Sequence, residues 1–160
     1  MSERFLAPLG FTIVSGGQTG ADRAGLDWAI AHGIAHGGWC PLGRASESGS
    51  IPERYQLVET KAKGYLTRTR WNVRDSDATV IFTMTETMDG GSLRTLDFAQ
   101  RLSKPCIHLW PGVPPYDLVQ FLNHFEVQIL NVAGKRASSA PGVYEFVLRT
   151  LSLSIAPRTN

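Results

Sequence analysis

Short apolar or β-branched runs alternate along this chain with longer stretches of helical spacing. The runs that we expect to form strands are residues 11–15, 34–40, 79–83, 106–110 and 127–131. The stretches that we expect to form helices are residues 21–32, 67–75, 92–102, 116–124 and 143–154. Strands that alternate with helices are typical of βαβ units around a parallel sheet. The sequence therefore predicts an α/β fold, a Rossmann-like, doubly wound and mostly parallel sheet, with the ligand at the carboxyl ends of its strands.

The length of the chain favours a single domain. A chain of 160 residues, 42% of them hydrophobic and 19% charged, can bury roughly two thirds of its unfolded surface in one core. We expect residues 1–160 to form one Rossmann-like ligand-binding domain, with its core at about 11–132 and a C-terminal helix at about 143–154.

Two connections are irregular. Residues 41–64 are rich in Gly, Ser, Pro and charge, and loops of this length are usually functional or disordered. We interpret this stretch as a lid over the ligand. Residues 134–142 are expected to be a surface connection before the last helix.

Composition excludes several classes of protein. Cys40 and Cys106 are too few for a disulfide framework and lack the spacing of a zinc site, which favours a cytoplasmic protein. No apolar run has the length of a signal peptide or of a membrane span, so we expect no membrane association. The four histidines show no ligand spacing, so we predict no metal site. A net charge of +2 is too small to predict a nucleic-acid partner by itself, and any anion site must be local.

The strongest local signal is a glycine loop between the first expected strand and the first expected helix. Glycines there allow a tight turn and close approach of a phosphate, which the N-terminus of the helix attracts. The spacing matches neither G-x-G-x-x-G nor the P-loop, since no lysine follows Gly20. A tight turn without a ligand is the alternative. The candidate phosphate-binding residues are Ser15, Gly16, Gly17, Gln18, Thr19, Gly20, Asp22 and Arg23.

A second glycine pair opens the helix after the third expected strand. If the first and third strands are neighbours, both helix N-termini point into one crevice, which suits a phosphorylated or nucleotide-like ligand. The candidate residues here are Gly90, Gly91, Ser92, Arg94 and Thr95.

Four further side chains are candidates to cover the ligand: Trp39, Arg44, Arg68 and Asn72. Trp39 would stack on a pterin or purine ring, or else pack in the core. Arg68 would contact the ligand, or else pack on the neighbouring Trp71. Asn72 would reach a ribose hydroxyl, or else cap the turn before the third strand.

Several segments together resemble a known family. They are Ser15 to Arg23, Gly38-Trp39-Cys40-Pro41-Leu42-Gly43-Arg44, Ile51-Pro52, Tyr55, Glu59-Thr60, Arg68-Thr69, Asn72-Val73, Asp75-Ser76-Asp77 and Gly90-Gly91-Ser92. These segments are similar to the putative molybdenum-carrier family. That family is grouped with the SLOG Rossmann-like superfamily, which includes the LOG phosphoribohydrolases and the DNA-processing protein DprA. The resemblance implies the Rossmann-like fold and molybdenum cofactor (molybdopterin) as cargo.

Three functions are therefore weighed. The first is a carrier or sensor that binds a phosphorylated heteroaromatic molecule, molybdenum cofactor or a nucleotide. The second is a LOG-like hydrolase of the nucleotide N-glycosidic bond. The LOG loop P-G-G-x-G-T-x-x-E, laid on Gly90-Gly91, places Asp97 at the catalytic glutamate, although the favoured interpretation of Asp97 is a solvent-facing helix carboxylate. Whether the chain is an enzyme stays open.

The third function is binding of single-stranded DNA in the manner of DprA, which the near-neutral charge argues against. Self-association as a homodimer or higher homo-oligomer is also expected, because SLOG relatives commonly assemble through helices. The apolar tail 143–156 carries more leucine and isoleucine than the surface of a monomer needs.

Overall fold

The computed structural model describes residues 3–158 and has a five-stranded sheet at its centre. All four pairings within this sheet are parallel, as the alternation of strands and helices predicted. The strands, in their order across the sheet, are β3 (Ala35–Gly37), β2 (Thr12–Val14), β10 (Ile129–Gly134), β8 (Ala78–Phe82) and β9 (Cys106–Leu109). The predicted fold class, a Rossmann-like α/β fold, is confirmed.

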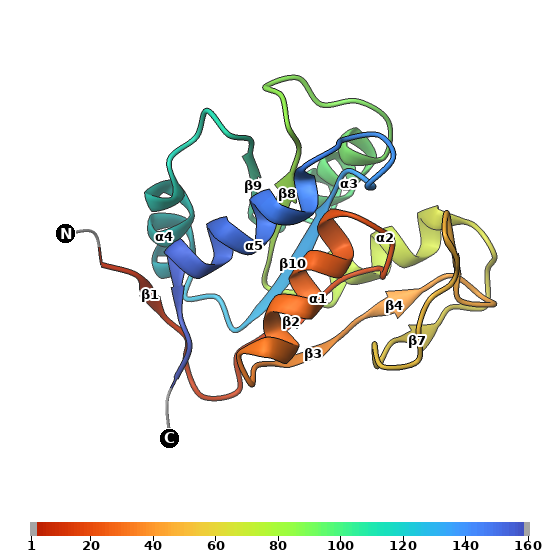
Figure 1. Cartoon of the computed structure of the whole chain (residues 1–160), viewed down its shortest axis with the longest axis horizontal. Helices are drawn as coiled ribbons and strands as arrows, with labels where there is room; N and C mark the ends of the chain where they lie inside the picture. The colour runs from red at the N-terminus through yellow and green to blue at the C-terminus, as the bar shows by residue number, and fades with distance from the viewer. Residues whose placement is uncertain (1–2, 159–160) are drawn as a thin grey trace.

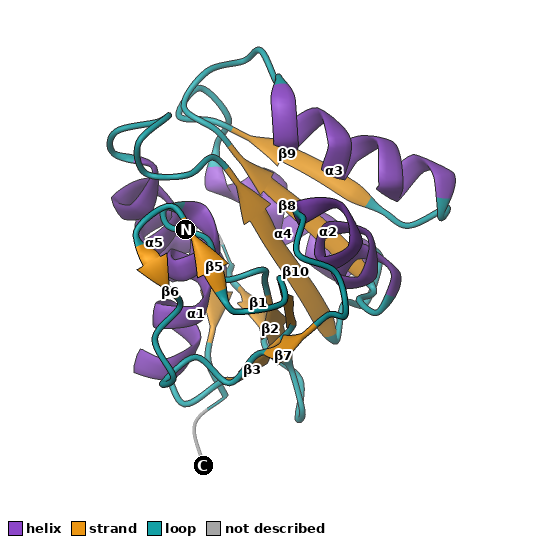
Figure 2. Cartoon of the chain, turned by 90° about the vertical axis from the view of Figure 1, so that its right-hand side faces the viewer, coloured by secondary structure: helices purple, strands orange, loops and turns teal. Residues whose placement is uncertain are grey.

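Helices cover both faces of the sheet (Figures 1 and 2). One face carries α1 (Ala21–Ala31), α4 (Pro115–His124) and α5 (Val143–Ser154), which contact one another in the pairs α1–α5 and α4–α5. The other face carries α2 (Tyr65–Arg74) and α3 (Gly90–Arg101), which also contact each other. None of the helices within residues 3–158 is both long and apolar enough to span a membrane.

The strand order differs from the expected one, and this difference determines where in the sheet the ligand site is expected. The first and third expected strands, β2 and β8, are not neighbours, because β10 lies between them. Counted from β10 as the first strand, the order across the sheet becomes 3-2-1-4-5, which is the Rossmann order. The point at which the strand order reverses therefore falls between β10 and β8, where doubly wound sheets bind their ligands.

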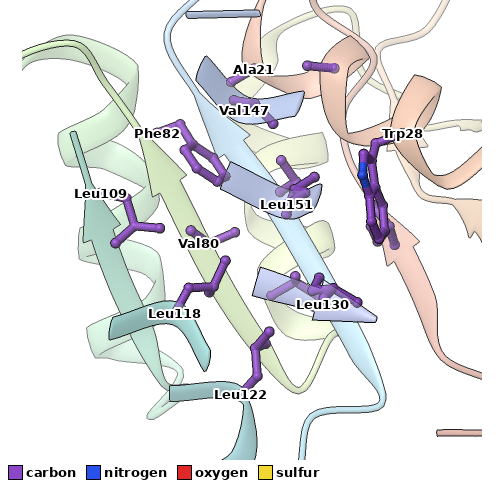
Figure 3. Packing of buried hydrophobic residues seen from close by; sticks show 14 of the residues in the cluster. Ala21, Trp28, Val80, Phe82, Leu109, Leu118, Leu122, Leu130, Val147 and Leu151 are labelled. Atoms are coloured by element: carbon purple, nitrogen blue, oxygen red, sulfur yellow. The ribbon is translucent and has the colours of Figure 1, made fainter. Parts of the chain in front are cut away.

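The main core lies between the sheet and the helices α1, α4 and α5. Figure 3 shows Trp28, Leu122, Leu130 and Leu151 packed there around the central strands, and each is almost fully buried. The tail was expected to offer an apolar surface for self-association. Instead, its apolar residues are mostly core, and among the large ones Leu153 is the exception, 54% exposed. The tail therefore gives no support for a dimer, and self-association stays a prediction.

The first and last described strands lie side by side. Residues of β1 (Phe5–Leu6) pair in parallel with β11 (Ile155–Ala156), which follows α5 directly. This two-stranded sheet brings the first and last described segments together.

The long connection 41–64 is ordered by its own small core. Within it, β7 (Val58–Glu59) pairs with β4 (Trp39–Cys40), which directly precedes the connection, and β5 (Ala45–Ser46) pairs with β6 (Gly49–Ser50) as a hairpin. A second hydrophobic cluster lies beneath it, made of Leu26, Cys40, Ile51, Tyr55 and Leu57.

Arg44 holds this connection in place. Its guanidinium donates hydrogen bonds to the carbonyls of Ile51, Pro52 and Tyr55 at 2.8–3.0 Å. The Arg44 side chain is thus bonded to the backbone of its own segment, and these contacts give no support to its predicted role over a ligand.

Candidate functional site

A pocket of about 550 Å³ opens at the carboxyl ends of β2, β10 and β8. Four segments line it: the glycine loop with the start of α1, one side of α2, the first two turns of α3, and the end of β10 with the loop that follows. The lining includes Gly16, Gln18, Asp22, Tyr65, Arg68, Asn72, Gly90, Gly91, Ser92, Arg94, Thr95, Gly134, Lys135 and Arg136. Both glycine pairs thus contribute to one pocket, at the point where the strand order reverses.

The charges around the pocket favour an anion. Four cationic side chains line it, Arg68, Arg94, Lys135 and Arg136, against the single carboxyl of Asp22. Among the ion pairs within residues 3–158, none involves Arg94. Convergent cations in a concave site attract and orient anionic ligands.

The first glycine loop is closed on itself. The N–H groups of Gly17, Gln18 and Thr19 donate to the Ser15 hydroxyl, the Asp22 carboxylate and the Gln18 side-chain oxygen, at 3.1–3.3 Å. The loop was expected to bind a phosphate through these N–H groups. They are already bonded within the chain, so this loop shapes the wall of the pocket.

Gly16 and Gly17 face different surroundings. A Cβ at Gly16 would lie 2.3 Å from Arg68 Nη1, so the missing side chain makes room for the arginine. Gly17 has a φ of 80°, and a Cβ there would lie 2.6 Å from Leu57 Cδ1. Gly17 therefore faces the second hydrophobic cluster, and it does not line the pocket.

The N-terminus of α3 is open by contrast. The carbonyl of Asp89 accepts the N–H of Ser92 at 3.1 Å, while the Asp89 carboxylate pairs with Lys135 and makes no cap. A Cβ built at Gly90 or Gly91 meets no atom within 4 Å. The first N–H groups of a helix have no partner within the helix and carry its positive dipole end, so this turn is suited to bind an anion.

Two buried polar atoms in the lining have no hydrogen-bond partner, Gln18 Nε2 and Ser92 Oγ. The assignment of the Gln18 amide is fixed by its neighbours, because its Oε1 accepts the N–H groups of Thr19 and Glu47 at 3.1 and 3.0 Å. Buried polar groups in folded proteins are nearly always bonded, and leaving one unpaired costs about 1–3 kcal/mol. Both atoms are therefore candidates to bond a ligand.

Arg68 and Asn72 brace the pocket from α2. The buried Arg68 guanidinium donates to the Gly16 carbonyl at 2.9 Å and lies 3.8 Å from the Asp22 carboxylate. Asn72 accepts the N–H of Trp39 at 2.8 Å and donates to the Trp39 carbonyl at 3.0 Å. Both side chains line the pocket while holding neighbouring backbone in place.

Asp22 is buried, with 7% of the residue exposed. Burial raises the pKa of its carboxyl, and this outweighs the opposite effects of the Arg68 guanidinium and the Gln18 N–H. A carboxyl whose pKa is raised on folding adds stability below its unfolded pKa and loses that contribution as the pH rises through the folded value.

We therefore expect Asp22→Asn to raise the melting temperature at pH 7, with a gain that shrinks as the pH falls toward about 4. The asparagine oxygen still accepts the Gln18 N–H, so the change removes charge with little change of shape. Thermal melts of the two proteins across this pH range measure the effect. A difference independent of pH would contradict the assignment.

The loop after β10 is the part of the site that sequence reasoning missed. Residues 134–142 were interpreted as a surface connection, yet Gly134, Lys135 and Arg136 line the pocket. The Glu47 carboxylate from the β5–β6 hairpin holds this loop, since the Thr19 hydroxyl and the Ser138 N–H and hydroxyl all donate to it. A glycine and two basic residues directly after a strand were the available signal.

Other predicted residues lie elsewhere. Arg23 is turned toward the β5–β6 hairpin, where it donates to the hydroxyls of Ser46 and Ser48. Trp39 donates through its indole N–H to Asp75 at 2.9 Å and packs edge-on against Trp71. Neither Arg23 nor Trp39 lines the pocket.

Three more predicted residues serve the fold around the pocket. Ser15 donates to the Asp22 carbonyl at 3.0 Å. Gly20 precedes α1 with a φ of 82°, and a Cβ there would lie 2.5 Å from the Lys135 carbonyl oxygen. Thr95 lines the pocket but donates its hydroxyl to the Gly91 carbonyl at 3.0 Å within its own helix.

Asp97 lies on the outer surface of α3. It pairs with Arg101 one turn away at 3.0 Å, with 52% of its side chain exposed, and it does not line the pocket. Asp97 therefore does not lie in the pocket as a catalytic residue would, because it follows the last residue of α3 that lines the pocket, Thr95.

Within residues 3–158 no three His, Cys, Asp or Glu residues are grouped closely enough to hold a metal ion. Cys40 and Cys106 are both free thiols outside the lining of the pocket. Burial raises the pKa of both, that of Cys106 to about 12.

One solved structure is closely similar in fold to this chain. The crystal structure of a putative molybdenum carrier protein from Syntrophus aciditrophicus superposes with a TM-score of 0.87 and is 41% identical, over 92% of this chain and 96% of that chain. A structure of (E)-4-hydroxy-3-methyl-but-2-enyl diphosphate reductase matches at 10% identity and a TM-score of 0.39, over 89% of this chain and 59% of that chain. No curated protein matches.

A family model described as the circularly permutated YpsA SLOG family matches residues 13–155. A circular permutation explains the strand order, since counting from β10 gives the Rossmann sequence of strands. The chain belongs to the circularly permuted YpsA family of the SLOG superfamily.

Proposed function

We propose that this protein is a carrier or sensor that binds a phosphorylated heteroaromatic small molecule, with the phosphate on the N-terminus of α3. One observation carries the proposal. The open first turn of α3, with the unpartnered Ser92 hydroxyl, lies in the same pocket as four cationic side chains. Helix N-termini with free N–H groups bind phosphate in many folds.

The phosphate would be held from two sides. The N–H groups of Gly90 and Gly91 and the Ser92 hydroxyl are available on the helix, and Arg94 adds a charge that no carboxylate within residues 3–158 neutralises. Lys135 reaches the same turn from the loop after β10, since it pairs there with Asp89. A phosphate would then replace Asp89 as the partner of Lys135.

The cargo we propose is molybdenum cofactor, which combines a phosphate with a pterin ring. The relative from Syntrophus aciditrophicus is called a putative molybdenum carrier protein, and this supports the choice. The residues fit the organic part of such a cargo, because the pocket offers donors, cations and the half-exposed ring of Tyr65. Neither cysteine lines the pocket, so this chain would hold the cargo by phosphate and ring.

The test is direct. Native mass spectrometry of freshly purified protein, with elemental analysis, should find an adduct that contains phosphorus, and molybdenum if the cargo is molybdenum cofactor. Titration calorimetry with nucleoside 5′-monophosphates should give one site per chain. Absence of any phosphorus-containing adduct, together with no heat from any phosphorylated compound, would overturn the proposal.

A hydrolase is the second candidate, and one observation favours it. Asp22 is a buried carboxyl with a raised pKa in the pocket, and such groups are common among catalytic acids. A LOG-like reaction would therefore use Asp22 in place of Asp97. Free base released from nucleoside monophosphates in the calorimetry samples, and lost in Asp22→Asn, would establish turnover.

A further inference from the structure

We propose that Gln18 and Asp22 form a second subsite, which binds the polar edge of a heteroaromatic ring where a hydrogen-bond acceptor lies beside an N–H. This inference rests on the proposed function, in which the phosphate of the same ligand lies at α3. It adds which part of the ligand the other end of the pocket would recognise.

Gln18 supplies the donor. Its Nε2 is buried without a partner, while its Oε1 is held by two backbone N–H groups. These two bonds prevent an exchange of oxygen and nitrogen, because an amide N–H in the place of Oε1 would face two donors. The residue is 6% exposed, so a ligand acceptor would reach Nε2 in a site shielded from water.

Asp22 supplies the acceptor. Its Oδ2 accepts the N–H of Gln18 at 3.1 Å and lies 3.8 Å from Arg68, while its Oδ1 accepts no hydrogen bond from any residue within 3–158. The bond between the two residues keeps them adjacent at one end of the pocket. A donor and an acceptor side by side complement a ring edge of the opposite pattern, as Gln and Asn do with adenine.

The strand order sets the distance between the two subsites. Gln18 and Asp22 follow β2, α3 follows β8, and β10 lies between these strands. Two inter-strand spacings separate the subsites by roughly 10 Å. A bare oxyanion cannot span that distance, whereas a ring joined through a sugar or short chain to a phosphate can.

Tyr65 offers a surface for the ring between the two ends. It lines the pocket from α2, and the guanidinium groups of Arg68 and Arg136 lie 5.4 and 5.2 Å from its ring centre. Aromatic and guanidinium planes are common partners for heteroaromatic rings. Arg68 connects this surface to the second subsite, because its guanidinium also lies 3.8 Å from the Asp22 carboxylate.

Two nearly isosteric substitutions exchange the hydrogen-bond donor or acceptor of the proposed subsite for its opposite. Gln18→Glu replaces the donor at Nε2 by an acceptor, and Asp22→Asn lets a donor take the place of Oδ1. Asp97→Asn, on the exposed side of α3, is the control that removes a carboxylate outside the pocket. Calorimetry would compare the tightest of AMP, GMP, CMP, UMP and neopterin monophosphate with ribose 5-phosphate, which has no ring edge.

For the wild-type protein and Asp97→Asn, we expect the ring-bearing ligand to bind about tenfold or more tightly than ribose 5-phosphate. This preference should be lost in Gln18→Glu and in Asp22→Asn, while ribose 5-phosphate still binds. Equal affinity of the wild type for both ligands, or a preference that both substitutions leave intact, overturns the second subsite alone. Failure of every phosphorylated ligand to bind the wild type overturns the proposed function with it.

Discussion

Gly91→Val should abolish binding of phosphorylated ligands while leaving the protein folded. The valine side chain would project into space that holds no atom within 4 Å of its Cβ, at the first turn of α3. There it would keep a phosphate from the N–H groups of Gly90 and Gly91. Losing two charge-assisted hydrogen bonds costs roughly 3 kcal/mol or more, which is about a hundredfold in Kd.

The stability of Gly91→Val should change little, within about 1 kcal/mol, because valine is a somewhat better helix former than glycine. Calorimetry and a thermal melt on the same sample measure both effects. Gly64→Val is the matched control, since Gly64 is the N-cap of α2, has equally open space, and does not line the pocket. Unchanged affinity in folded Gly91→Val would remove the phosphate from α3.

Gly17→Val should have the opposite effect, a loss of stability with little loss of affinity. A non-glycine residue at a φ of 80° is strained by about 1–2 kcal/mol. Overpacking against Leu57 and Ile51, 2.6 and 3.0 Å from the new Cβ, adds about 1–3 kcal/mol. The sum of roughly 2–5 kcal/mol lowers the melting temperature by about 5–15 °C in a domain of this size.

The two contributions can be separated with Gly43→Val. Gly43 has a φ of 85° and nothing within 4 Å of a Cβ, so valine there suffers the backbone strain without the overpacking. Its melting temperature should fall less than that of Gly17→Val. Below its melting transition, Gly17→Val should bind ligand about as well as the wild type. If it is stable but binds nothing, the first glycine loop and not α3 holds the phosphate.

The sequence did not show that the two glycine pairs have different roles. Both pairs open helices after parallel strands, and from the sequence both are candidate anion sites, the first loop being the stronger signal. The difference between them comes from the side chains that contact each pair, some of which are distant in the sequence. Asp22 and Ser15 occupy the N–H groups of the first loop, and the side chains of Ile51 and Leu57 lie where a Cβ of Gly17 would go.

By itself, the sequence determined the kind of fold and the positions of the two glycine turns. Periodicity and turn residues act over a few positions along the chain, so the alternation of strands and helices could be predicted from them. Even there, the strand expected at 127–131 is β10 at Ile129–Gly134, displaced toward the pocket.

Only the tertiary structure decided which segments meet in the site. Strand order is set by packing between distant segments, and nothing local in residues 127–134 predicts that β10 pairs with both β2 and β8. That pairing brings Lys135 and Arg136 to the wall of the pocket. It also sets the separation of the two ends of the pocket, because the distance between two loops depends on the strands that lie between them.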